Sequence, residues 1–153
     1  MFEQGKTVEH TAHYLASTMQ ILQPPGWSPP KGYANGIRCE GTLLFVAGQI
    51  GWNEQAELVT GDLAGQVEQA LKNVVAILRE GGARPEHLVR LTWYVTDKRE
   101  YLDARKALGA IYRRVIGPHY PTMTLVEVAD LLEAGAKVEI EATAVIPFDK
   151  QED

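Results

Sequence analysis

Two segments near the C-terminal end constrain the fold most, because both have the character of β-strands. In residues 137–146, apolar side chains alternate with polar ones, which is typical of a strand with one buried face. Residues 120–129 form a second apolar segment with strand character. Glu139 and Glu141 fall on one face of the later strand, with Cβ atoms about 7 Å apart. A solvated strand face is one interpretation of this pair, and a functional site is the alternative.

The rest of the chain alternates predicted strands with predicted helices. Because strands joined through helices need right-handed crossovers, both helices are expected on one side of a single mixed sheet, an α+β fold. The uncovered face then predicts burial against further copies of the chain. The predicted elements are strands at 37–40, 43–50, 89–95, 120–129 and 137–146, one helix between Asp62 and Gly81, and another between Asp97 and Gly117.

Both predicted helices carry a start signal. Asp62 is expected to cap the first helix, and Asp97 the second, with Glu100 reaching back to the Asp97 amide as in a capping box. The first helix has an apolar stripe at helical spacing, which predicts a buried face. That stripe consists of Val67, Ala70, Leu71, Val74, Val75 and Leu78.

Length and charge limit the possible functions. The 153 residues fit one domain, and the net charge of -5 disfavours a general nucleic-acid surface, because phosphate binding needs clustered Lys and Arg. No apolar run is long enough to span a membrane and no signal-peptide layout begins the chain, so a cytoplasmic protein is expected. Residues 1–30, with four prolines between 24 and 30, are interpreted as an arm and extended connector, 31–148 as the domain, and 149–153 as a tail.

No metal or cofactor is predicted. His10 and His13 are three residues apart, but nothing near them in the sequence completes a metal site. Cys39 is the only cysteine, so an internal disulfide is impossible. Its expected role is that of a small apolar side chain.

Several motifs resemble the RidA/YjgF family of reactive intermediate/imine deaminases. They are the Val126-Glu127-Val128-Ala129 segment after Pro121, the closing Val138-Glu139-Ile140-Glu141-Ala142, the strand Phe45-Val46-Ala47-Gly48-Gln49-Ile50, the helix segment Gln69-Ala70-Leu71-Lys72-Asn73-Val74, and Thr92-Trp93-Tyr94-Val95-Thr96-Asp97. The resemblance runs in order from about Tyr33 to Ile146. It implies a chorismate-mutase-like fold assembled as a homotrimer, with small-molecule clefts between subunits.

The resemblance also implies site residues, with one important departure. In deaminating members an arginine after the proline anchors the substrate carboxylate and a later glutamate positions the water; here Met123 stands at the arginine position and Glu139 at the glutamate. Leu125 replaces a frequent cysteine, while Tyr33 matches a cleft tyrosine. Arg105, where deaminases often carry Asn, is a candidate replacement anchor. The alternative is a surface arginine paired with Asp103, Glu100 or solvent.

Three functions remain open from the sequence. The first is an imine or enamine hydrolase of altered specificity, with Glu139 activating water, Tyr33 closing the cleft, and a substrate group against Met123 and Leu125. The second is a trimer that binds a small metabolite without catalysis. The third is a ribonuclease, which the acidic composition disfavours.

Overall fold

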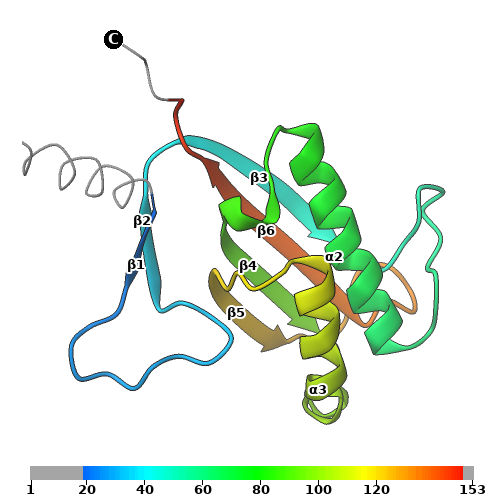
Figure 1. Ribbon diagram of the computed structural model, residues 1–153. Coiled ribbons are helices and arrows are strands. Elements are labelled where there is room, and N and C mark those ends of the chain that lie inside the picture. Colours follow the sequence, from blue (N-terminus) through cyan, green and yellow to red (C-terminus); the bar gives the residue numbers. More distant parts are fainter. Residues whose placement is uncertain (1–18, 150–153) are drawn as a thin grey trace, which may run out of the picture.

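The structure is a computed structural model that describes residues 19–149 (Figure 1). Its main body is a four-stranded sheet with two helices, and a two-stranded ribbon projects from it. The elements in chain order are β1 (Met19–Leu22), β2 (Gly36–Cys39), β3 (Thr42–Gln49), α2 (Leu63–Glu80), the 3₁₀ helix η1 (Pro85–His87), β4 (Leu88–Val95), α3 (Lys98–Val115), β5 (Thr122–Glu127) and β6 (Val138–Ile146).

The main sheet is mixed, as the strand and helix order predicts. Its strand order is β3-β6-β4-β5, with β6 antiparallel to both neighbours and β5 parallel to β4. Figure 1 shows α2 and α3 on the same side of this sheet, which confirms the α+β arrangement. The predicted stripe of α2 is fully part of the core, because all six of its apolar residues are buried.

The N-terminal ribbon corrects one expectation. The predicted first strand forms as β2, but it pairs with β1 in a separate two-stranded sheet instead of joining the main one. Strand β1 itself lies within residues 1–30, which were interpreted as an arm and extended connector. The chain returns to the main sheet at Ala34, whose amide donates to the Pro121 carbonyl over 3.0 Å, forming a single bridge beside edge strand β5. Residues 1–18, with His10 and His13, lie outside the described part.

The helix starts follow the sequence closely, with one exception. The Asp62 side chain accepts from the Gly65 amide at 2.7 Å, and the Asp97 side chain accepts from the Glu100 amide at 3.0 Å, so both predicted caps are confirmed. The reciprocal bond of the capping box is absent among the residues described: the Glu100 carboxylate lies 2.8 Å from Lys137 Nζ. An ion pair to the residue before β6 has replaced the local contact, because the fold brings a lysine within reach.

A buried glutamine joins α2 to two loops. Gln66 has no exposed surface, and its amide nitrogen donates to the carbonyls of Thr60 and Gly135, each at 3.0 Å. Its side-chain oxygen accepts from the Lys137 amide at 2.7 Å. All three partners are backbone groups, which would otherwise need water or strand partners. Gln66 therefore fixes the approach of the chain to both α2 and β6.

The sheet face opposite the helices is open in a single chain. Phe45 is 72% exposed there and Leu43 is 60% exposed. Tyr94 also points to this face, and its hydroxyl donates to Glu141 Oε1 at 2.9 Å. Trp93, the neighbour of Tyr94 in β4, points the opposite way and is buried beneath the helices.

The imidazole of His87 is held in its neutral form at the start of β4. Its Nδ1 accepts a hydrogen bond from the Arg84 amide at 3.0 Å, a bond that needs an unprotonated nitrogen. Burial, and after it the positive charge of Arg84, lowers the pKa of His87 below its ordinary value, while Glu86 acts in the other direction.

This arrangement predicts a pH-dependent stability. Because the folded chain binds the His87 proton less readily than the unfolded chain, the free energy of unfolding should fall as the pH drops below the ordinary histidine value of 6.5. Urea denaturation of wild type and His87→Gln at a series of pH values between about 7.5 and 5.5 measures this effect. The slope against pH should be shallower in His87→Gln. Equal slopes would contradict the assignment.

Candidate binding site under helix α3

A cavity of about 500 Å³ lies between α3 and the edge of the sheet. We call it the helix cavity. Its size is within the range of about 300–1,000 Å³ that is typical of small-molecule sites. The lining residues come from three places: the loop between β1 and β2, the helix-facing side of β4 and β5, and one face of α3 with the turn after it. They are Lys31, Gly32, Trp93, Tyr101, Arg105, Leu108, Gly109, Tyr112, Arg113, Tyr120, Met123 and Leu125.

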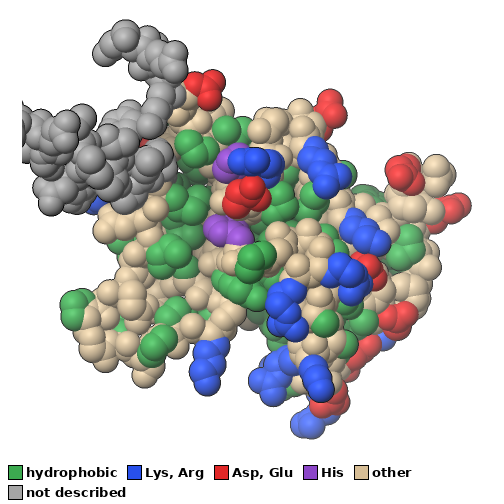
Figure 2. Space-filling view, in the orientation of Figure 1, with side chains coloured by type: hydrophobic (Ala, Val, Ile, Leu, Met, Phe, Trp, Pro, Cys, Tyr) green, Lys and Arg blue, Asp and Glu red, His purple; other side chains and the backbone are tan. Residues whose placement is uncertain are grey.

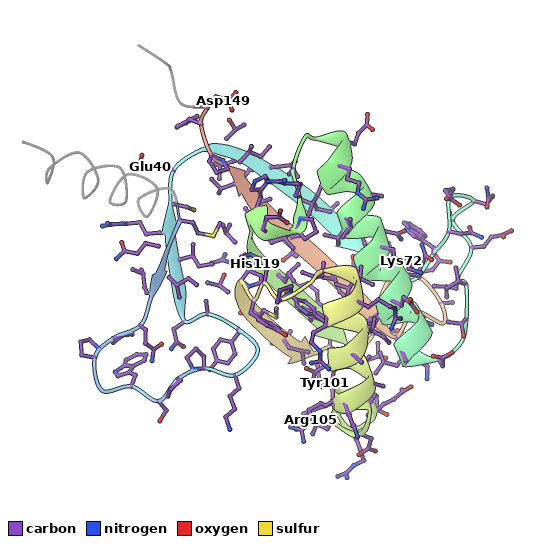
Figure 3. The ribbon with its side chains drawn as sticks, viewed as in Figure 1. Glu40, Lys72, Tyr101, Arg105, His119 and Asp149 are labelled. Carbon is purple, nitrogen blue, oxygen red and sulfur yellow. The ribbon has the colours of Figure 1, made fainter. Side chains whose placement is uncertain are left out.

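The helical repeat of α3 places four of its residues on the side that faces the cavity. Tyr101, Arg105, Leu108 and Tyr112 are spaced at i, i+4, i+7 and i+11, which places them on one helix face. Tyr101 and Arg105 lie one turn apart near the start of α3 in Figure 3. The interior side chains Trp93, Leu108 and Tyr112 are buried, whereas Arg105 is exposed. The cavity therefore has an apolar interior and a cationic mouth.

The charge at the mouth is entirely positive. Lys31, Arg105 and Arg113 line the cavity, whereas no Asp or Glu of the described residues does. Within residues 19–149 none of these three forms an ion pair. Figure 2 shows Lys and Arg side chains gathered over α3. In a chain of net charge -5, such a local excess of positive charge favours an anionic ligand.

The sequence left two interpretations of Arg105, a replacement anchor for a carboxylate or a surface arginine paired with Asp103, Glu100 or solvent. Its Nε donates to the Leu102 carbonyl at 3.2 Å, a contact within its own helix. The expected alternative partners are not used: no ion pair with Asp103 is formed among the described residues, and Glu100 pairs with Lys137. The guanidinium keeps most of its donors available beside the cavity.

Aromatic side chains form much of the cavity wall. The rings of Tyr112 and Tyr120 stack with centroids 5.3 Å apart, and the Tyr112 hydroxyl donates to the His119 carbonyl at 2.6 Å. Burial raises the pKa of both Tyr101 and Tyr112 above the ordinary tyrosine value. Both phenols therefore stay protonated near neutral pH and cannot act as bases. The Tyr112 hydroxyl already donates its hydrogen bond to His119, whereas Tyr101 can donate a hydrogen bond to a ligand.

Trp93 contributes an unusual polar atom to this wall. It is 6% exposed, and its indole Nε1 is the one buried side-chain nitrogen or oxygen among the described residues without a hydrogen-bond partner. An unpaired buried donor costs about 1–3 kcal/mol. Such groups are uncommon in folded proteins, and this one belongs to a side chain that lines the cavity.

Met123 and Leu125 lie in the helix cavity, whereas Glu139 lies on the other side of the sheet. In the ladder Met123 pairs with Leu91, and Leu125 with Trp93, so both point toward the helices. Glu139 pairs with Tyr94, which lies three residues after Leu91 on β4. Because side chains alternate between the two faces along a strand, Tyr94 and its partner Glu139 point away from the helices, to the open face. The structure thus brings Arg105, Met123 and Leu125 together and leaves Glu139 apart within one chain.

Glu139 occupies a position kept clear by a glycine. A Cβ added at Gly48, in the irregular part of the β3–β6 pairing, would overlap with the Glu139 side chain, Oε1 included. No hydrogen bond to Glu139 is formed by another side chain within residues 19–149. The carboxylate remains available on the open face.

Tyr33 lies in a second cavity, which we call the ribbon cavity. This space of about 640 Å³ between the ribbon and the sheet is lined by Tyr33, Asn35, Phe45, Arg90, Thr122 and Thr143, among others. Met123 lines both cavities, because it belongs to the edge strand between them. Tyr33 therefore does not close over Arg105 within one chain.

Sequence reasoning missed several residues of the helix cavity. Lys31, Gly109 and Arg113 all line it. The i, i+4, i+8 spacing of Arg105, Gly109 and Arg113 was a usable signal, since these positions lie near one another on a helix. Lys31 carried no comparable signal, because only the path of the ribbon brings it to α3.

Within residues 19–149 no group of three or more His, Cys, Asp or Glu side chains is placed to hold a metal ion. Over the same residues, neither helix combines the length and apolar character of a membrane span.

The sequence matches a known family over most of its length. Residues 26–146 match the sequence profile described as Endoribonuclease L-PSP. The chain therefore belongs to this family, the RidA/YjgF family, as the motifs around Gly48 and Glu139 predict.

Two relatives are similar to the chain over most of its length. A RutC family protein of Aquifex aeolicus is 32% identical over 127 residues, covering 82% of this chain and 98% of the relative. The human 2-iminobutanoate/2-iminopropanoate deaminase is 29% identical over 132 residues, covering 86% of this chain and 90% of the relative.

Solved structures extend the comparison to the fold. The Rid family protein YyfB of Yersinia pestis is 30% identical, with a TM-score of 0.75 over 84% of this chain and 99% of that one. Escherichia coli TdcF, solved with bound serine, is 32% identical, with a TM-score of 0.59 over 80% of this chain and 92% of that one.

Proposed function

We propose that the chain binds a small organic acid in the helix cavity and hydrolyses its imine or enamine form, with Arg105 as the carboxylate anchor in place of the arginine absent at Met123. The observation that carries this proposal is that Arg105 lines the same cavity as Met123 and Leu125 and forms no ion pair within residues 19–149. A bidentate arginine contact suits a carboxylate. The deaminase name of the human relative and the serine bound to TdcF support a small-molecule ligand.

The reaction needs an anchor, a water and a proton route. Water adds to the C=N carbon of a protonated imine, the nitrogen takes up a proton, and ammonia leaves as the C–N bond breaks, with a carbonyl as the other product. Arg105 would hold the carboxylate, and Met123 with Leu125 would pack against the carbon skeleton. Glu139 would take the proton from the water.

This chemistry requires more than one copy of the chain. Glu139 points to the open face, opposite the helix cavity. We therefore propose a homotrimer in which the cleft lies between subunits, so that Glu139 and Tyr33 from one copy complete the cavity of another. The exposure of Leu43 and Phe45 on the open face supports such an assembly, because contact with a second copy would bury them.

Binding without catalysis is the second candidate function. It is favoured by the same separation of Glu139 from the helix cavity. In that case the protein would hold an organic acid between Arg105 and the aromatic wall, and no reaction would follow. Glu139→Ala would then change no turnover, since none exists.

Release of ammonia from freshly generated 2-iminopropionate tests the hydrolase proposal. We expect turnover in wild type, a loss of at least about 100-fold in Glu139→Ala, and partial or full activity in Met123→Arg, which restores an arginine beside the cavity. Light scattering on the same samples reports whether the copies assemble.

The three samples separate the candidate functions. Wild-type activity that persists in Glu139→Ala would remove Glu139 from the mechanism. Activity in Met123→Arg alone would mean that the scaffold supports catalysis but that Arg105 does not anchor this substrate. Inactivity of all three, with a folded assembly, would favour binding without catalysis.

A further inference from the structure

The helix cavity is larger than a short organic acid requires. Its volume of about 500 Å³ equals that of roughly 17 water molecules at about 30 Å³ each. A short acid such as pyruvate, with six non-hydrogen atoms, would leave most of this space filled with water. A ligand that fills it needs an additional body of about ring size.

Gly109 keeps the middle of the cavity open. It is a helix-interior position, where glycine costs about 1 kcal/mol relative to alanine. A Cβ there would meet only Arg113 Nη1, at 3.5 Å, so the space above Gly109 is otherwise free. The same distance shows that the Arg113 guanidinium turns back over Gly109. A cation therefore lies above the gap left by the missing side chain.

The walls around this gap suit a flat apolar group. Trp93, Tyr101, Tyr112 and Tyr120 provide aromatic surfaces. The cations Lys31, Arg105 and Arg113 are exposed at the mouth, whereas the aromatic interior is buried or half-buried. An amphipathic acid fits this gradient in one orientation, with its anionic group at the mouth and its apolar body inside.

We infer that the helix cavity selects acids with an aromatic or similarly bulky apolar body over short aliphatic acids, with Gly109 providing the space and Arg113 a second cationic contact. This inference rests on the proposed binding of an organic acid in the same cavity. Aromatic stacking and apolar burial supply the preference, while the cations bind the carboxylate that both kinds of acid share.

Calorimetric titration with two matched probes tests this preference. Phenylpyruvate and pyruvate have the same 2-oxo acid group and differ by one phenyl ring. We expect phenylpyruvate to bind wild type at least 10-fold more tightly, which corresponds to about 1.4 kcal/mol. Gly109→Leu should remove most of that preference by filling the gap. Gly109→Ala should reduce the preference less than Gly109→Leu does, because its single methyl group fills less of the gap and makes an ordinary contact with Arg113.

A surface variant keeps the test decisive if Gly109→Leu does not fold. Arg113→Gln changes an exposed side chain and should weaken the binding of both probes at least 3-fold. Equal affinity of wild type for the two probes would overturn the size preference and leave the proposed acid site standing. Binding of neither probe would overturn both. A preference that survives intact in folded Gly109→Leu would place the ring elsewhere and also overturn the inference.

Discussion

Replacing Arg105 by Gln should weaken the binding of phenylpyruvate by about 10- to 150-fold, because a hydrogen-bonded contact to a charged group contributes about 1.5–3 kcal/mol. Gln is long enough to keep the apolar stem packed on α3 but carries no charge. The side chain is exposed and, within the part of the chain that the structure describes, bonds only to Leu102 in its own helix, so the fold should remain intact. Calorimetry gives the affinity, and thermal denaturation reports the fold.

Arg99→Gln is the matched control for this experiment. Arg99 belongs to the same helix but does not line the helix cavity. Its replacement removes an equal charge from the chain and should leave the affinity within about 2-fold of wild type, since exposed charges away from the site are screened by salt. Equal losses in the two variants would show that Arg105 acts through the general field and not as an anchor.

Replacing Gln66 by Leu should lower the free energy of unfolding by about 3–5 kcal/mol. The variant keeps a similar volume but leaves three backbone groups without partners: the carbonyls of Thr60 and Gly135 and the amide of Lys137. Each buried group that loses its partner costs about 1–3 kcal/mol, and local water can recover part of this. Urea denaturation of both proteins measures the difference.

Gln69→Leu separates this effect from a general cost of the substitution. Gln69 lies on the same helix and bonds to the Asn73 side chain instead of to distant loops. Its replacement should cost less than about 1 kcal/mol, the range of one ordinary hydrogen bond. A loss in Gln69→Leu as large as in Gln66→Leu would contradict the role of Gln66 in joining α2 to the loops before β6.

Met123 stands where the family resemblance implies an arginine, and its ladder partner is also apolar. Its side chain and that of Leu125 lie on the helix-facing side of β5, where their ladder partners are Leu91 and Trp93. Positive charge instead comes from α3 and the ribbon loop, through Arg105, Arg113 and Lys31. The cations of this cavity therefore belong to α3 and the ribbon loop and not to β5.

The sequence alone was sufficient for the local features of the chain. The alternation in 137–146 predicted β6, the helical spacing of Val67 to Leu78 predicted the buried face of α2, and Asp62 and Asp97 were identified as caps. These features depend on neighbours along the chain, within one strand or a few helical turns. Family membership was also readable, because its motifs consist of contiguous residues.

Only the tertiary structure decided which distant residues meet. Strand register placed Met123 and Glu139 on opposite faces, since a shift of one residue reverses the face of every side chain. The path of the ribbon brought Lys31 to α3, and Lys137 drew Glu100 away from its own helix start. Such contacts depend on how elements pack across the fold, which the local pattern of residues does not encode.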